Sequence, residues 1–182
     1  PIYLQDQQRS RGFIIGGLGL EYALTHSTKL YANATQSYRP VQFADLTTPP
    51  TTDVIDPNLT DAKGLNIDAG FRGSVRDYLL FDISAYHLDY DNRVGTIKQQ
   101  RNDGTFYNLR TNVGRSTAQG VEAFGELNIT KALGAASKAG DLSAFVSYAY
   151  NDARYTNFKV VTVVNNALSE SNLENKKVEY AP

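Results

Sequence analysis

Two long arms without proline flank residues 102–104, and they limit the possible folds more than any other feature of the sequence. The arms span about residues 78–100 and 105–129, so each is longer than twenty residues. Strands of globular proteins usually have about 5–6 residues, whereas a strand that crosses a bilayer needs about 9–11 tilted residues. The arms are therefore long enough to cross a membrane and continue beyond it.

The residues between the arms predict a hairpin turn. They are Asn102, Asp103 and Gly104. An Asp-Gly pair supplies the positive φ angles that a primed turn requires. The sequence therefore predicts a primed turn at the tip of one long antiparallel hairpin.

Apolar and polar residues alternate with a period of two in most other segments. The run at 64–75 is the clearest, and similar runs lie at 12–25, 120–129 and 142–150. In the first of these runs one face carries Leu65, Ile67, Ala69, Phe71 and Val75, and the other carries Asn66, Asp68, Arg72 and Ser74. Helical spacing is weak and confined to about residues 130–139. The pattern predicts an all-β chain.

The apolar face is ambiguous along one arm, at 78–91. Apolar residues are odd-numbered up to Ala85, and then Tyr86, Leu88 and Tyr90 are even-numbered. Either a β-bulge or the membrane boundary explains this switch. Tyr86 and Tyr90 are also expected at a similar height to Tyr148 and Tyr150, as in an interfacial aromatic girdle.

Connections of alternating length predict how the strands are oriented. Short turns are expected at 26–28 and 76–77, with a looser connection at 131–140, whereas 39–62 is a long loop rich in Pro and Thr. Outer-membrane barrels have short periplasmic turns and long external loops. The long loop, the tip at 102–104 and the segment after about 152 are then external. The predicted fold is an antiparallel up-and-down meander of about six strands, part of a transmembrane β-barrel.

Composition excludes several classes of function. The 182 residues carry 18 basic and 19 acidic side chains, a net charge of −1, so no basic surface for nucleic acid is indicated. Cysteine is absent, which excludes disulfides and thiolate chemistry. Methionine is absent too and the chain begins at Pro1, so we expect a processed product or a fragment. No run reaches the ~18 apolar residues of a membrane helix.

The sequence shows no combination of residues that is typical of an enzyme active site. His26 and His87 lie at opposite ends of expected strands, which does not suit a metal site or a triad. Glu122 and Glu126 share a strand face about 13 Å apart, beyond the about 5–10 Å of a glycosidase pair. The sequence therefore predicts no enzyme, no bound metal and no cofactor.

Five short strings occur in order along the chain: DPNLTDAKG at 56–64, GFR at 70–72, YHLDYDNRV at 86–94, GVE at 120–122 and NLENKKVEYAP at 172–182. In this order they resemble segments of the barrel of TonB-dependent receptors. The first string is similar to the family's "N-L-x-P-E" signature, although Thr60, Asp61 and Ala62 stand where Lys, Pro and Glu are common, as in Bacteroidetes-like members. Residues 37–43 resemble the ferric-citrate type of receptor.

The resemblance implies a fold and a function. It implies a barrel of about twenty-two strands, filled by an N-terminal plug, in the bacterial outer membrane. Such a receptor imports ferric chelates, siderophores or ferric citrate, or another small nutrient, with energy from the TonB complex. Residues 1–182 would form about six strands of it, with the plug, the TonB-contacting part and the final strands outside the chain.

Arginines of the expected loops and upper lumen are the candidate ligand-binding residues. A citrate-like chelate is anionic, and guanidinium groups bind carboxylates in a bidentate manner. The candidates by position are Arg39, Arg93, Arg101 and Arg110. Solvated arginines at a loop or rim are the plainer interpretation of each.

Two other architectures are compatible with a β-rich chain. A soluble β-sandwich that binds carbohydrate or protein would need strands near 5–6 residues and apolar faces that meet in a core. Another outer-membrane barrel, a porin or an adhesin, differs only in lacking the family-like strings.

Overall fold

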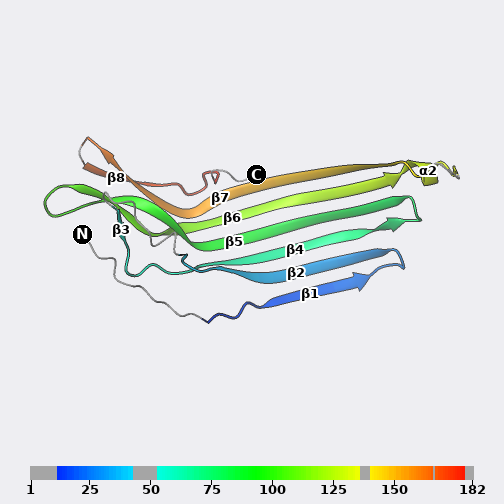
Figure 1. Cartoon of the computed structure of the whole chain (residues 1–182), viewed down its shortest axis with the longest axis horizontal. Helices are drawn as coiled ribbons and strands as arrows, with labels where there is room; N and C mark the ends of the chain where they lie inside the picture. Colours follow the sequence, from blue (N-terminus) through cyan, green and yellow to red (C-terminus); the bar gives the residue numbers. More distant parts are fainter. Residues whose placement is uncertain (1–11, 43–52, 136–139, 166, 179–182) are drawn as a thin grey trace.

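The fold is one long, curved sheet (Figure 1). The computed structural model describes residues 12–42, 53–135, 140–165 and 167–178. The strands follow the order β1-β2-β4-β5-β6-β7-β8, and every neighbouring pair on this path is antiparallel. Their bounds are β1 Gly17–Ala23, β2 Thr28–Arg39, β3 Asp53–Ile55, β4 Ala62–Val75, β5 Leu79–Gln100, β6 Phe106–Asn128, β7 Ser143–Val164 and β8 Ala167–Asn172.

The predicted meander of long strands is confirmed. β5, β6 and β7 have 22, 23 and 22 residues, which matches the length of the two arms and extends the run at 142–150 by a further fourteen residues to Val164. Strand β4 begins at Ala62, within the string at 56–64 that resembles the family signature. Pro49 and Pro50 of the predicted loop, Phe43 and residues 179–182 lie outside the described residues.

The turn at 102–104 corrects the predicted turn type. Gly104 has φ +84°, but Asp103 does not have a positive φ. The Gly104 N–H donates to the Arg101 carbonyl at 3.0 Å, and the Arg101 N–H donates to the Thr105 carbonyl at 2.8 Å. The Asp103 carboxylate accepts from the backbone and hydroxyl of Thr105 instead. One glycine in the left-handed region therefore closes a longer hairpin loop.

The opposite end of the sheet carries the connections from β1 to β2, from β4 to β5 and from β6 to β7. Arg76 turns the chain between β4 and β5 with φ +50°. The connection from β6 to β7 begins with α2, Ile129–Ala132, a single turn at whose start the Asn128 side-chain oxygen accepts the Lys131 N–H at 2.9 Å. None of the helices in the described segments has the length and apolarity needed to span a membrane.

The strand register sorts side chains onto an apolar face and a polar face. Leu65, Ile67, Val121 and Leu127 lie on the apolar face and remain 38–45% exposed. Other large exposed side chains on this face are Leu18, Leu20, Tyr22, Leu30, Ile83, Val146, Tyr148 and Tyr150. The alternation therefore does not build a dry core between two sheets, which argues against the sandwich alternative.

Buried side chains gather at the loop end of the sheet. Among the described residues, those under a tenth exposed are Leu59, Ala62, Val113, Ser116, Ala153 and Tyr155. All of them lie beyond the apolar band, where β5, β6 and β7 bend and a loop packs on them. Among the described residues, the most buried part of the sheet is thus the loop end rather than its middle.

The ambiguity along 78–91 is resolved by the register of β5. Pairing with β4 and β6 continues without interruption from Leu79 to Tyr90, so no bulge lies there. Odd-numbered residues stay on the apolar face, which becomes polar at His87, as at a membrane boundary. Tyr86 pairs with Gly120 and Tyr150 pairs with Val121, so these two tyrosines point to opposite faces. The predicted girdle joining Tyr86 and Tyr90 to Tyr148 and Tyr150 is therefore wrong.

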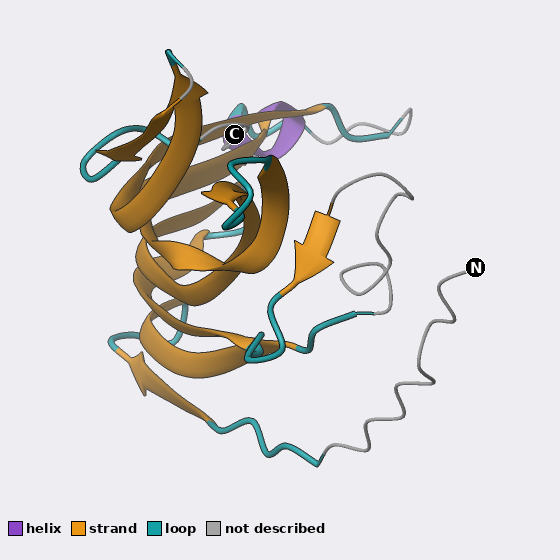
Figure 2. Cartoon of the chain, turned by 90° about the vertical axis from the view of Figure 1, so that its left-hand side faces the viewer, coloured by secondary structure: helices purple, strands orange, loops and turns teal. Residues whose placement is uncertain are grey.

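The sheet is curved (Figure 2), and hydrogen bonds between side chains two strands apart place the polar face on its concave side. The Tyr31 hydroxyl of β2 reaches over β4 to donate to Asp82 of β5 at 2.9 Å. Glu21 of β1 likewise reaches over β2 to Arg72 of β4 at 2.6 Å. Side chains two strands apart meet in this way because the sheet curves toward them. The concave side is thus polar and internally bonded, as the lumen wall of a barrel would be.

Candidate functional site

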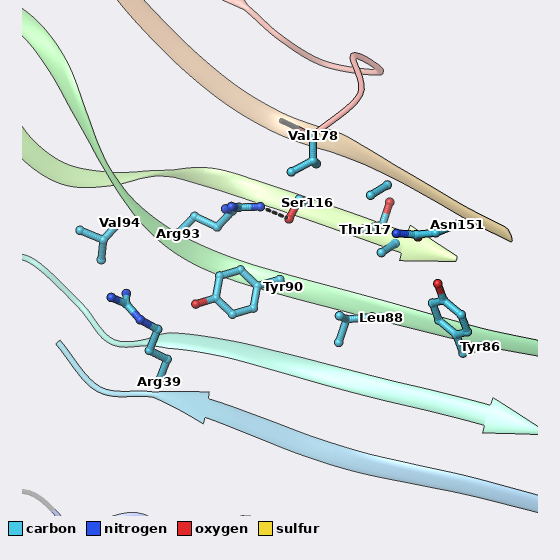
Figure 3. Close-up of a pocket in the computed structure, with 12 residues that line it drawn as sticks. Arg39, Tyr86, Leu88, Tyr90, Arg93, Val94, Ser116, Thr117, Asn151 and Val178 are labelled. Carbon is cyan, nitrogen blue, oxygen red and sulfur yellow. Dashed lines mark hydrogen bonds between the residues drawn. The ribbon is translucent and has the colours of Figure 1, made fainter. Parts of the chain in front are cut away.

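A cavity of about 620 Å³ opens on the polar face near the loop end (Figure 3). Strands β2, β5, β6 and β7 form its walls. Its lining is mixed aromatic, cationic and small polar: Arg39, Tyr86, Leu88, Tyr90, Arg93, Val94, Ser116, Thr117, Ala118, Asn151, Ala153 and Val178. Two of the four predicted arginines, Arg39 and Arg93, are therefore brought together here.

Arg39 is placed by the end of β2. It is the last residue of that strand and pairs with the buried Ala62 at the start of β4. Its guanidinium extends toward Tyr90 and Val94 (Figure 3). Two strand ends fixed against each other thus hold the base of this side chain at the cavity.

A β-bulge in β5 places Arg93. The register with β6 shifts between Tyr90 and Val94, and Asn92 adopts φ +57°. Asparagine tolerates this left-handed conformation better than most residues. The bulge breaks the alternation, so the consecutive residues Arg93 and Val94 both line the cavity. A regular strand would have turned one of them to the opposite face.

The guanidinium of Arg93 is held by a hydroxyl and two rings. It donates from Nη1 to the Ser116 Oγ at 3.0 Å. It also lies 5.6 Å from the ring centre of Tyr90 and 5.8 Å from that of Tyr155, within the range of cation–π attraction. Ser116 is 5% exposed and Tyr155 is 8% exposed, so the contact is shielded from water.

A close approach of β6 and β7 creates the wall that carries Tyr155. A Cβ at Gly114 would lie 1.8 Å from the backbone oxygen of Asn157, so no larger residue fits there. Directly beside it the pairing shifts by one residue, from Arg115 with Asn157 to Ser116 with Tyr155. This shift brings Ser116 and Tyr155 opposite each other on the polar face.

A strap formed by residues 53–62 closes the loop end. Its short strand β3 pairs in parallel with β6 at Asn108 to Arg110, inside the curve of the sheet (Figure 2). The Asn112 amide oxygen accepts from the backbone and hydroxyl of Thr60, at 2.9 and 3.0 Å. The Asn112 amide nitrogen donates to the Thr60 and Asn92 carbonyls, at 3.0 and 2.8 Å. One side chain thus joins the strap to the β5 bulge.

The other two predicted arginines lie elsewhere. Arg101 sits at the exposed hairpin tip, 4.8 Å over the Tyr107 ring. Arg110 lies in β6 beneath the strap, and its carbonyl accepts the Asp56 N–H at 2.9 Å. Among the described residues neither lines the cavity, and their role in ligand binding stays a prediction.

Sequence reasoning missed Ser116, Asn151 and Tyr155 as residues of the site. The alternation of Asn151, Ala153 and Tyr155 on one face of β7 is visible in the sequence once this strand is known to continue past Asp152. The register shift beside Gly114 is not visible, because it depends on how β6 meets β7.

The guanidinium groups of Arg39 and Arg93 are chemically suited to bind a carboxylate. Each guanidinium carries five N–H donors in a planar fork that matches a carboxylate. Tyr86 and Tyr90 add hydroxyl groups and apolar rings at the same wall (Figure 3). His87 pairs with Asp89 at 3.5 Å on the opposite, apolar face. In the described segments, no group of three His, Cys, Asp or Glu residues is placed to hold a metal ion.

Known structures share this fold. The copper transporter OprC matches with a TM-score of 0.51 and 19% identity, over 76% of this chain and 20% of OprC. The ferric-catecholate import receptor Fiu from E. coli K12 matches with a TM-score of 0.52 and 22% identity, over 80% of this chain and 19% of Fiu. The chain thus spans about one fifth of each of these two proteins.

Sequence comparison identifies the family. No curated protein matches the chain. The family model described as "TonB dependent receptor-like, beta-barrel" matches residues 3–182, which is nearly the whole sequence. Given this match and a curved meander of long strands with an exposed apolar face, the chain belongs to the TonB-dependent receptor-like β-barrel family.

Proposed function

We propose that the chain is one stretch of a larger outer-membrane receptor that imports a ferric chelate bearing carboxylates, of the ferric-citrate kind. The observation that carries the proposal is the pair Arg39 and Arg93 at one cavity on the polar face. A chelate with several carboxylates offers each guanidinium a bidentate partner.

The position of the cavity supports an entry site. It lies beyond the apolar band, at the end where the long hairpin and the strap are found (Figure 1). In outer-membrane barrels long loops face the outside. A ligand that arrives from the medium would meet these arginines before it meets the membrane-level part of the polar face.

Other parts of the receptor complete the proposed mechanism. We place a plug domain, the segment that contacts the TonB complex and the final strands in regions outside residues 1–182, in a barrel of about twenty-two strands as the family resemblance implies. The chain itself would supply about six membrane strands and one wall of the ligand site. Lipid would cover its apolar face, where Ile83 and Val121 are half exposed.

Binding of iron(III)–citrate to the complete receptor, the full gene product that contains this chain, tests the proposal. We expect the double substitution Arg39→Gln with Arg93→Gln to raise the Kd about 10- to 100-fold, because each change removes hydrogen bonds between charged groups. Equilibrium binding of radioactive iron(III)–citrate measures this change in Kd, and uptake of the same ligand into cells provides a second measurement.

Arg76→Gln provides the matched control. It removes one positive charge from the exposed turn between β4 and β5, at the opposite end of the sheet from the cavity. We expect the Kd of this variant for iron(III)–citrate to stay within about twofold of wild type, since an exposed charge far from the cavity is screened by solvent and salt. Equal effects of the control and the double variant would contradict a site at Arg39 and Arg93.

A further inference from the structure

The Arg93 side chain lies between two aromatic rings of different strands. Tyr90 comes from β5 and Tyr155 from β7, and the guanidinium is 5.6 and 5.8 Å from their ring centres. Ser116 of β6, which lies between these strands, accepts its hydrogen bond at 3.0 Å. Side chains of three strands therefore contact the Arg93 guanidinium, whereas a solvated arginine at the rim would mainly contact water.

Both the N–H and the carbonyl of Tyr155 form hydrogen bonds to the segment that follows β8. Its N–H donates to the Lys176 carbonyl at 3.0 Å, and its carbonyl accepts the Asn175 N–H at 2.8 Å. The φ of +64° at Asn175 allows the returning segment to make both bonds. The ring of Phe158 packs on Tyr155 with centroids 4.3 Å apart.

The same returning segment forms part of the cavity. The Val178 N–H donates to the Ala153 carbonyl at 2.9 Å, and the Val178 side chain lines the cavity. The segment that fixes Tyr155 is thus also a wall of the proposed ligand site, as Figure 3 shows for Val178.

We propose that Tyr155 is a positioning residue: together with Tyr90 it holds the Arg93 guanidinium against Ser116, and this preorganised cation gives the cavity its selectivity for anionic ligands. The selectivity rests on the proposed function, but the positioning of Arg93 does not. A side chain already fixed in its binding geometry loses little rotamer freedom when the ligand arrives.

A ligand-independent experiment tests the positioning. In the complete receptor, phenylglyoxal modifies arginine side chains, and mass spectrometry follows Arg93 with Arg101 as the internal reference. Because the ring shields the guanidinium, Tyr155→Leu should speed modification of Arg93 about 3- to 30-fold, the range of a cation–π contact. Tyr155→Phe retains a ring and should restore the wild-type rate to within about threefold.

Tyr148→Leu is the matched control, since Tyr148 lies on the apolar face of the same strand. It should leave the Arg93 rate unchanged. Ser116→Ala offers a second variant that removes the hydroxyl without removing a buried ring, and it should also speed the modification. Equal Arg93 rates in wild type, Tyr155→Leu and Ser116→Ala would overturn the proposal.

Binding then tests the selectivity with two probes, iron(III)–citrate and a neutral ferric trihydroxamate. Tyr155→Leu should raise the Kd for iron(III)–citrate about 3- to 30-fold and change that for the neutral chelate less than about twofold. Equal losses for both probes would mean a general packing defect and would overturn the selectivity. A wild-type receptor that does not bind iron(III)–citrate would overturn the proposed function, and the Arg93 rates would still decide the positioning.

Discussion

Asp56 shows how single polar residues fasten the strap. One carboxylate oxygen accepts the Thr111 hydroxyl at 2.6 Å and the other accepts the Asn58 N–H at 2.8 Å. These hydrogen bonds lower the pKa of Asp56 below its ordinary value of 3.8, and the bond from Thr111 has the larger effect. The charged form is therefore the one that favours the packed strap.

The lowered pKa makes attachment of the strap depend on pH. A carboxylate with a lowered folded-state pKa stabilises the fold above its unfolded pKa, and this stability is lost as pH falls through the folded pKa. Hydrogen–deuterium exchange of residues 53–62, corrected for the intrinsic pH dependence of exchange, should thus be constant from about pH 7 to 5 and faster below about pH 4.

The variant Asp56→Asn isolates this carboxylate from the nearby Asp61. An amide keeps one oxygen acceptor and loses the other, so the strap should exchange faster than wild type at neutral pH. Its exchange should also lose the acid-dependent step that Asp56 contributes. An unchanged acid step in Asp56→Asn would show that another group is responsible.

Residue-level features were predictable where they depend on local conformation. Gly104 was expected at positive φ, and the structure places it there because glycine alone lacks the Cβ penalty. The conformation of Asp103 was not predictable from the pair, since its carboxylate bonds Thr105 and allows a longer loop. Arg39 and Arg93 were named without any means of knowing that the bulge at Asn92 would unite them.

At the scale of elements, the long strands have an apolar face, which we propose contacts lipid, and a polar face on the concave side of the sheet. Ile83 of β5 lies on the apolar face and pairs with Ala123 of β6, next to Glu122, which lies on the polar face and pairs with Ser84. The side chains of Ile83 and Glu122 are both exposed. Their contrasting surroundings predict opposite tolerance to the same substitution.

Ile83→Lys should destabilise the complete receptor in a bilayer by about 2–4 kcal/mol, because Ile83 lies well inside the apolar band and this is the cost of a lysine facing lipid near the midplane. Urea unfolding in lipid vesicles, followed by the far-UV spectrum, measures this change in the free energy of unfolding. Glu122→Lys is the matched control and should change it by less than about 0.5 kcal/mol, because the polar face is hydrated. Similar costs at both positions would contradict the assignment of the two faces.

The six strands of the meander were predictable as elements because each carries a repeated local pattern. β3 was missed because it has three residues and forms only against β6, so its own sequence holds no period. β8 is short and polar and forms by pairing with the end of β7. Such strands depend on the partner that the rest of the fold provides.

At the scale of the whole molecule, the two ends of the sheet differ in construction. One end has the tight turn around Asp77 and the longer connection from β6 to β7 that contains α2. The other has the hairpin tip at Asn102, the strap and the β7–β8 hairpin (Figure 1). The membrane sidedness that we propose, with the first end periplasmic and the second external, is a property of this asymmetry and not of any single residue.

The absence of cysteine in the chain allows a direct test of that sidedness. In intact cells, a membrane-impermeant maleimide should label Asn102→Cys of the complete receptor, since the hairpin tip is exposed and proposed to lie outside. It should label Asp77→Cys only after the outer membrane is permeabilised, although the Asp77 side chain is 74% exposed. Because both positions are accessible in the folded protein, a difference between them reports the membrane barrier rather than burial. Labelling of Asp77→Cys in intact cells would place the short turns outside and would reverse the orientation on which the ligand entry route depends.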